Sequence, residues 1–150
     1  MVKKNASVEE LLAFTRRQLK DFDAFAFGAF GSQIWKIVQR SRNDRGLNEV
    51  HEVMKDVLRA SQPLLKSFDA RNLVGLFYGC AKLQMKAEDF PHGWLEDWGT
   101  AFCGCIGQAK SQDLANTAYA VGILKARMND NFWRVLTGDI MRKIGSFKPQ

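Results

Sequence analysis

The sequence predicts an all-α protein, an α-solenoid of about three helical hairpins behind one leading helix, which makes seven helices. The first observation is a repeat, because the segment 70–83 (ARNLVGLFYGCAKL) returns in altered form as 111–124 (SQDLANTAYAVGIL). This offset of 41 residues aligns Leu73 with Leu114 and Tyr78 with Tyr119, and such a period is typical of stacked helical units. The second observation is apolar residues at helical spacing along a chain with only three prolines.

The first third of the chain predicts a leading helix over 7–20, followed by the first repeat over about 22–67. Ser7 and Glu10 form a capping box at the start of the leading helix. The segment 22–24 (FDA) matches 68–70, and a helix is expected from Phe25 to about Arg40. A polar turn over 41–46 leads to a second helix over 47–66, in which Pro63 predicts a kink or an early end.

Two further repeats are expected over about 68–108 and 109–146. In the first of them, Asp69 is the predicted N-cap of the first helix. Residues 84–89 are a predicted loop, and the second helix of the hairpin is expected over 90–107. In the second, Ser111 is the predicted cap of a helix that reaches about residue 125, and Asn129 starts the last helix, which Gly145 ends. Because residues 147–150 look like the start of a further repeat, the sequence predicts a slice of a longer array.

Composition and charge narrow the class of partner. The 150 residues are enough for one domain with a core, and 22 basic against 16 acidic residues give a net charge of +6. This charge favours an anionic partner, with nucleic acid preferred over a membrane surface. The sequence contains no run of 18 apolar residues, the length that would predict a membrane span. The N-terminal residues lack the apolar region of a signal peptide. Three cysteines are too few for a disulfide framework and favour a reducing, intracellular compartment.

Motifs for catalysis or metal binding are weak throughout the sequence. The two histidines, His51 and His92, stand in no known catalytic or metal-binding spacing, and His51 is expected on the surface. Cys103 and Cys105 are too closely spaced for a zinc knuckle, have no second pair, and are expected in the core. The sequence therefore predicts a protein that is not an enzyme and uses no cofactor or metal.

The later repeats resemble a known family. The segment 114–124 (LANTAYAVGIL), with the tail 146–150 (SFKPQ), is similar to the octotricopeptide repeat, whose first helix opens with a pattern like Phe-x-Pro-Gln-x-Leu-Ala-Asn-x-x-Trp-Ala. The heptatricopeptide arrays of RAP and FAST-kinase-type organellar proteins are close relatives of that repeat. This chain departs from the pattern with Tyr78 and Tyr119 in place of Trp, and with Gly75 where Asn116 matches the usual Asn.

The resemblance implies an α-solenoid that binds single-stranded RNA in a mitochondrion or plastid. Such proteins act in maturation, stabilisation or translation of organellar transcripts, and some are components of organellar ribosomes, where they hold rRNA. The resemblance also implies that the first helix of each hairpin lines the RNA-binding face. The exposed stripes of these helices then supply candidates for base contacts, since helical-repeat proteins read base edges with a few side chains per repeat: Arg71, Asn72, Gln112, Asp113 and Asn116. Candidates for phosphate contacts are Lys36, Arg40, Lys82, Lys125 and Arg127.

Two alternatives share the predicted architecture. One is a protein-interaction scaffold of the tetratricopeptide or armadillo type, in which the aromatic segment 22–30 and the face around Trp133 bind partner helices. The other is a structural part of a ribonucleoprotein that contacts other proteins and holds rRNA mainly through phosphates.

Overall fold

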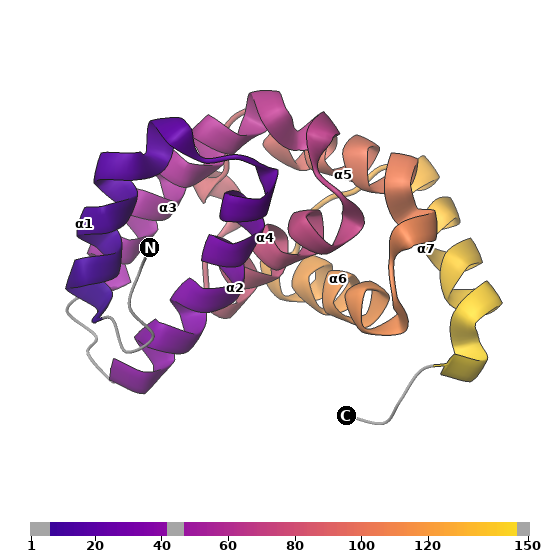
Figure 1. Ribbon diagram of the computed structural model, residues 1–150. Helices are drawn as coiled ribbons and strands as arrows, with labels where there is room; N and C mark the ends of the chain where they lie inside the picture. The colour runs from indigo at the N-terminus through magenta and orange to yellow at the C-terminus, as the bar shows by residue number, and fades with distance from the viewer. Residues whose placement is uncertain (1–6, 42–46, 147–150) are drawn as a thin grey trace.

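The structure, a computed structural model, describes residues 7–41 and 47–146. These residues form seven α-helices, short 3-10 segments and no strand, which confirms the predicted all-α class (Figure 1). The polar turn predicted over 41–46 lies almost wholly outside the described residues, as does the further repeat predicted over 147–150. The helices are α1 (Val8–Gln18), α2 (Ala24–Ser41), α3 (Leu47–Ser61), α4 (Ala70–Lys82), α5 (Trp94–Cys105), α6 (Ser111–Leu124) and α7 (Asp130–Lys143).

The helices lie in two rows. In the first row α4 packs between α2 and α6, and the α2–α4 pair makes the most extensive helix contact of the described chain (Figure 1). The second row holds α3 with its 3-10 extension η3 (Gln62–Ser67), then α5, then α7. Contacts along α2 and α4 advance together, from Gly28 beside Asn72 to Trp35 beside Tyr78, so these two helices run in the same direction.

Glycines allow α2 and α4 to approach very closely. A Cβ on Gly31 would lie 2.5 Å from the Cα of Leu76, and one on Gly79 would meet the carbonyl oxygen of Gly31. A Cβ on Gly75 would lie 2.9 Å from the backbone carbonyl oxygen of Gly28. Glycine at position 75 is therefore explained by backbone packing, because any side chain there would push the two helices apart.

Aromatic side chains fill the space between the two rows. Phe77 of α4 contacts Trp94 and Trp98 of α5, and Trp98 in turn contacts Phe132 of α7. Each tryptophan N–H is satisfied although both rings are fully buried: Trp94 donates to the hydroxyl of Ser61 at 3.0 Å, and Trp98 to the carbonyl of Leu73 at 2.9 Å. Burying large rings without an unpaired donor supplies much of the apolar stabilisation that holds the rows together.

Several predicted helix ends are confirmed. Ser7, Asp69 and Asn129 each accept a hydrogen bond from a backbone N–H of the first turn that they cap. The helix that contains Pro63 changes at Ser61 into the 3-10 segment η3, as the proline predicted.

Other predicted ends are wrong for local reasons. Ser111 is the first residue of α6, and Lys110 holds the cap position, where its backbone N–H donates to the carboxylate of Asp113. The helix expected from residue 90 begins only at Trp94, because Gly93 precedes it with a φ of 77°, in the left-handed region.

His51 is half-buried, which corrects the prediction that it lies on the surface. Its Nε2 lies 2.7 Å from the carbonyl oxygen of Leu83, at the end of α4. This bond fixes the C-terminal end of α4 against α3, so the histidine has a structural role.

Candidate nucleic-acid interface

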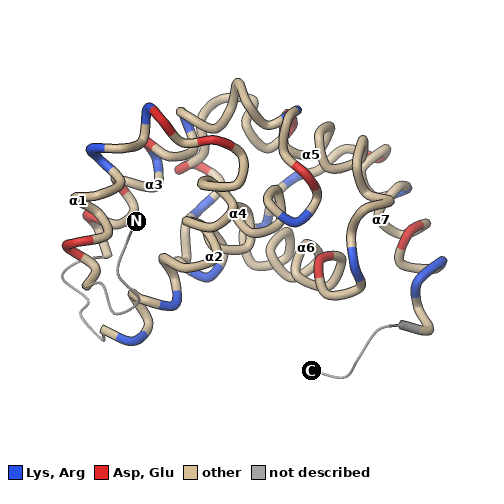
Figure 2. Tube along the Cα trace, in the orientation of Figure 1, with Lys and Arg blue, Asp and Glu red and all other residues tan. Residues whose placement is uncertain are grey.

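The first row of helices carries a groove with a volume of about 430 Å³ on its solvent side. It runs from the middle of α2 across the N-terminal half of α4 to the start of α6. Figure 2 shows Lys and Arg positions spread along this row. The lining residues are Ser32, Trp35, Lys36, Arg71, Val74, Gly75, Tyr78, Gln108, Lys110, Gln112, Asp113 and Asn116.

The structure brings five of the ten candidate RNA contacts together in this groove, four of the base-contact candidates and one lysine: Arg71, Gln112, Asp113, Asn116 and Lys36. Gln112 donates from Nε2 to the Oδ1 of Asn116 at 2.8 Å, so these two amides form one polar unit on α6. Amide groups of this kind present both donors and acceptors, which is what recognition of a base edge requires.

The other candidates lie elsewhere. Asn72 is half-buried, and its side chain packs against Gly28 of α2, outside the groove. Arg40, Lys125 and Arg127 are exposed but do not line the groove. Lys125 ends α6 with a φ of 52°, in the left-handed region.

Lys82 lies among three aromatic rings instead. Its Nζ is 4.9 Å from the ring centre of Trp35, 6.0 Å from that of Tyr78 and 5.8 Å from that of Tyr119. One ring comes from each helix of the first row, with centroid distances of 5.9 Å from Trp35 to Tyr78 and 5.7 Å from Tyr78 to Tyr119. We call Trp35, Tyr78 and Tyr119 the aromatic row.

Sequence reasoning missed two groups of this site, Lys110 and Trp35. The sequence prediction put the cap of α6 at Ser111, so it did not consider Lys110. In the structure Lys110 holds that cap position and lines the groove. Trp35 stands 43 positions before Tyr78, whereas the match of 22–24 with 68–70 gives an offset of 46. The repeat alignment therefore did not place Trp35 opposite Tyr78, and only the packing of α2 against α4 shows the contact.

The charge in the groove is mainly positive. Lys36, Arg71 and Lys110 face a single carboxylate, that of Asp113, and no ion pair joins any of these cations to an acidic side chain of the described residues. Cations that are not neutralised by the protein itself remain available to phosphate groups, which they attract without regard to sequence.

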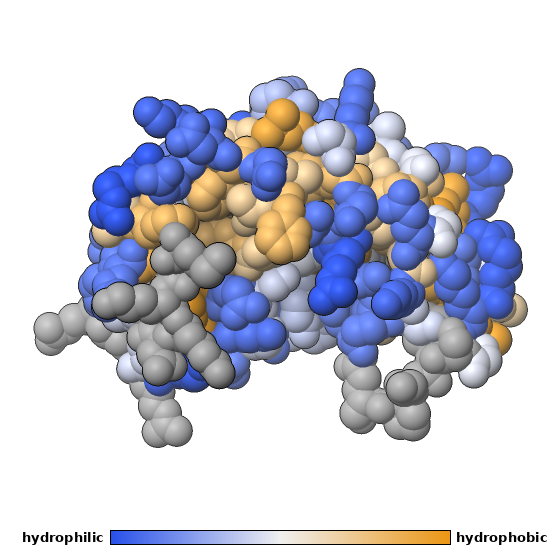
Figure 3. All heavy atoms as spheres, in the orientation of Figure 1, coloured by the Kyte–Doolittle hydropathy of each residue, from blue (hydrophilic) through white to orange (hydrophobic). Residues whose placement is uncertain are grey.

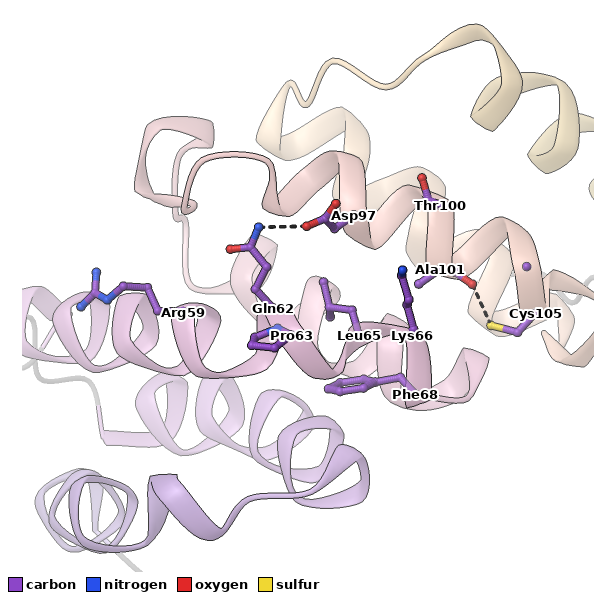
Figure 4. Close-up of a pocket in the computed structure, with 11 residues that line it drawn as sticks. Arg59, Gln62, Pro63, Leu65, Lys66, Phe68, Asp97, Thr100, Ala101 and Cys105 are labelled. Carbon is purple, nitrogen blue, oxygen red and sulfur yellow. Dashed lines mark hydrogen bonds between the residues drawn. The ribbon is translucent and has the colours of Figure 1, made fainter.

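A second, larger pocket of about 880 Å³ lies in the other row, between η3 and α5 (Figure 4). Across it, Gln62 donates from Nε2 to the carboxylate of Asp97 at 3.0 Å. Arg59, Lys66 and Cys105 also line it. None of the candidate RNA contacts belongs to this pocket, although its volume is the greater.

Two further classes of site find no support among the described residues. No group of three or more His, Cys, Asp or Glu side chains in this part of the chain is arranged to hold a metal ion. Burial raises the pKa of the Cys80, Cys103 and Cys105 thiols, which disfavours the reactive thiolate.

Within the described residues, no helix combines the length and the apolar character needed to cross a membrane.

Comparisons with protein-family models, with curated proteins and with solved structures gave no match to this chain.

Proposed function

We propose that this protein is an RNA-binding α-solenoid without catalysis of its own, which binds single-stranded RNA along the face formed by α2, α4 and α6. The hairpins α2–α3, α4–α5 and α6–α7 are its repeats, and α1 is its leading helix. The stacking of α2, α4 and α6 in one row supports this architecture. The observation that carries the function is the groove, in which cations and amides from all three helices gather beside the aromatic row.

Within this proposal, the groove holds RNA in two ways. Lys36 and Lys110 contact phosphates and supply affinity that depends on salt. Arg71, a base-contact candidate from the sequence, takes a phosphate role in this proposal, because it carries a full charge and no acidic side chain of the described residues pairs with it. Gln112 and Asn116 contact base edges and supply sequence preference. The role in maturation, stabilisation or translation of organellar transcripts, or in holding rRNA in an organellar ribosome, is supported by the resemblance of 114–124 to the octotricopeptide repeat.

A salt titration of RNA binding tests the phosphate contacts. The affinity for fluorescein-labelled single-stranded RNA, measured by fluorescence anisotropy, should fall as salt rises, with a slope of about −0.7 in log affinity for each phosphate contact. Replacing Lys36, Arg71 and Lys110 together with glutamine should reduce that slope by about 2.

The control replaces Arg59 and Lys66, basic residues of the η3–α5 pocket, with glutamine. This variant should keep the slope of the wild-type protein within about 0.7, the value of one contact. Absence of binding at physiological salt, or equal effects of the two variants, would contradict the proposed RNA-binding face.

A sequence-preference measurement tests the base contacts. Changing Gln112 and Asn116 to alanine should shift the preference among RNAs in a random-pool selection, while leaving the salt slope near the wild-type value. An unchanged preference would show that the amides do not read bases and would favour a ribonucleoprotein component that holds RNA through phosphates.

A protein-interaction scaffold is the second candidate function, because apolar side chains are exposed on the last hairpin. Among the described residues, five of the seven large exposed apolar side chains lie on α6, on α7 or directly after it: Tyr119, Ile123, Trp133, Met141 and Ile144. Figure 3 shows apolar surface at the centre of the visible face, with smaller apolar areas toward α7 at the right. Exposed apolar surface of this kind marks sites of protein contact. Binding of partner helices without RNA affinity would favour this function.

A further inference from the structure

The aromatic row ends in an exposed ring. Tyr78 is half-buried between Trp35 and Tyr119, whereas 45% of the surface of Tyr119 is exposed to solvent. Tyr78 and Tyr119 occupy the same position in successive repeats. Tyr78 is therefore a packing residue between helices, while Tyr119 has a neighbouring ring on one side and solvent on the other.

Lys82 adds a positive charge beside this exposed ring. Its Nζ lies near three aromatic rings, and no acidic side chain of the described residues forms an ion pair with it. A cation–π contact at a partly exposed site contributes only about 0.5–1 kcal/mol. The lysine can therefore bind a phosphate at little cost while its side chain stays near the rings.

The exposed ring also lies next to the groove. Asn116, which lines the groove, stands three residues before Tyr119 on α6, and Tyr78 both lines the groove and contacts Tyr119. An RNA strand that follows the groove past Asn116 therefore reaches Tyr119 and Lys82 next. Proteins that bind single strands without sequence preference combine a basic groove with aromatic rings in this way.

We infer that an unpaired base stacks on the exposed ring of Tyr119 while the adjoining phosphate contacts Lys82. This inference rests on the proposed RNA-binding function and adds a second kind of contact to it. Every base has a π face, so stacking on Tyr119 holds a nucleotide whichever base it carries. This contact is additional to the base-edge contacts of the Gln112 and Asn116 amides.

The test compares variants of Tyr119 in their affinity for oligo(U) and oligo(A) RNA, measured by fluorescence anisotropy. Tyr119→Ala should weaken the binding of both RNAs by about 5- to 100-fold, the range found when a stacking ring is removed. Tyr119→Phe keeps the ring and should stay within about 2-fold of the wild-type affinity. The matched control is Ile123→Ala, which removes an equally exposed apolar side chain one turn further along α6.

Three outcomes would overturn the inference. If Tyr119→Ala binds RNA as tightly as the wild-type protein does, Tyr119 is not a stacking platform, and the proposed function stands without it. If Ile123→Ala weakens binding as much as Tyr119→Ala, the effect is that of a general apolar surface. If the wild-type protein binds no RNA, the inference falls together with the proposed function.

A gain-of-signal variant keeps the test decisive if Tyr119→Ala fails to fold. Tyr119→Trp retains a ring and should bind RNA at least as tightly as the wild-type protein. Its additional tryptophan emission, taken relative to the wild-type protein, should fall when RNA is added, because a stacked base quenches the indole. Unchanged additional emission on saturation with RNA would contradict stacking at this position.

Discussion

Replacing Gly31 with alanine should destabilise the protein, because the new methyl group would enter the contact between α2 and α4. Its Cβ would lie 2.5 Å from the Cα of Leu76 and 2.7 Å from the carbonyl oxygen of Gly75, both of them backbone atoms. Ordinary contact begins near 3.4 Å. Neither atom can rotate away as a side chain would, so the two helices have to separate.

The size of the effect follows from two opposing terms. Separating α2 from α4 by about 1 Å disturbs a well-packed interface, at a cost of about 3 kcal/mol, the upper end for overpacking. Alanine in the middle of a helix recovers about 1 kcal/mol relative to glycine. The expected net loss in the free energy of unfolding is therefore about 2 kcal/mol, which lowers the Tm by about 4–8 °C for a chain of this size.

Urea denaturation followed by far-UV circular dichroism measures this loss. The matched control is Gly122→Ala on α6, where the added Cβ meets no atom within 4 Å. With the propensity gain alone, Gly122→Ala should raise the free energy of unfolding by up to about 1 kcal/mol. Equal stability of Gly31→Ala and the wild-type protein, or effects of the same sign for the two variants, would refute the close packing of α2 against α4.

The remaining predictions concern a buried carboxylate, a cap and a thiol. Burial alone would raise the pKa of Asp139, but hydrogen bonds from Lys143 and Arg142 outweigh it and hold that pKa below its usual range. The stabilisation that Asp139 supplies is then complete above about pH 4 and lost as pH falls through the lowered pKa. Asp139→Asn should cost about 2 kcal/mol at pH 7, measured by urea denaturation, and progressively less as pH falls below about 4; a constant difference across pH would contradict this. Asp69→Ala removes the cap of α4 and should cost about 1 kcal/mol, whereas Asp69→Asn should stay close to the wild-type protein; equal losses would argue against capping. Because Cys80 is fully buried and its pKa is raised, it should react with a thiol reagent only as fast as the protein unfolds, and labelling in the folded state before Cys103 and Cys105 would contradict the packing.

The number and order of the helices could be predicted because the local signals are strong. Apolar spacing located the seven helices, and the caps at Asp69 and Asn129 are short-range features of the sequence. The ends of helices were harder to predict where two signals compete. The serine at 111 suggested a cap, but the carboxylate of Asp113 already satisfies the backbone N–H of Lys110, which places the cap one residue earlier.

The candidate site could be predicted only in part, because its residues come from three helices. Helical spacing placed Arg71, Gln112 and Asn116 on the exposed stripes of α4 and α6, and the resemblance to the octotricopeptide repeat made them candidates for base contacts. The place of Asn72 depends on how closely α2 approaches α4, which only the packed structure shows. In the same way, Lys82 was predicted to contact phosphate, but its position among three rings is a tertiary feature that no single helix displays.

Photo-crosslinking with 4-thiouridine RNA tests most directly whether the face of α2, α4 and α6 binds RNA. After crosslinking and digestion, mass spectrometry identifies the peptides that carry a nucleotide. The proposed function predicts crosslinks in peptides that contain residues of the groove or the aromatic row, with Tyr119 among them, and their loss when Lys36, Arg71 and Lys110 are replaced with glutamine. Crosslinks confined to the η3–α5 pocket, around Lys66 and Cys105, would contradict the proposed face.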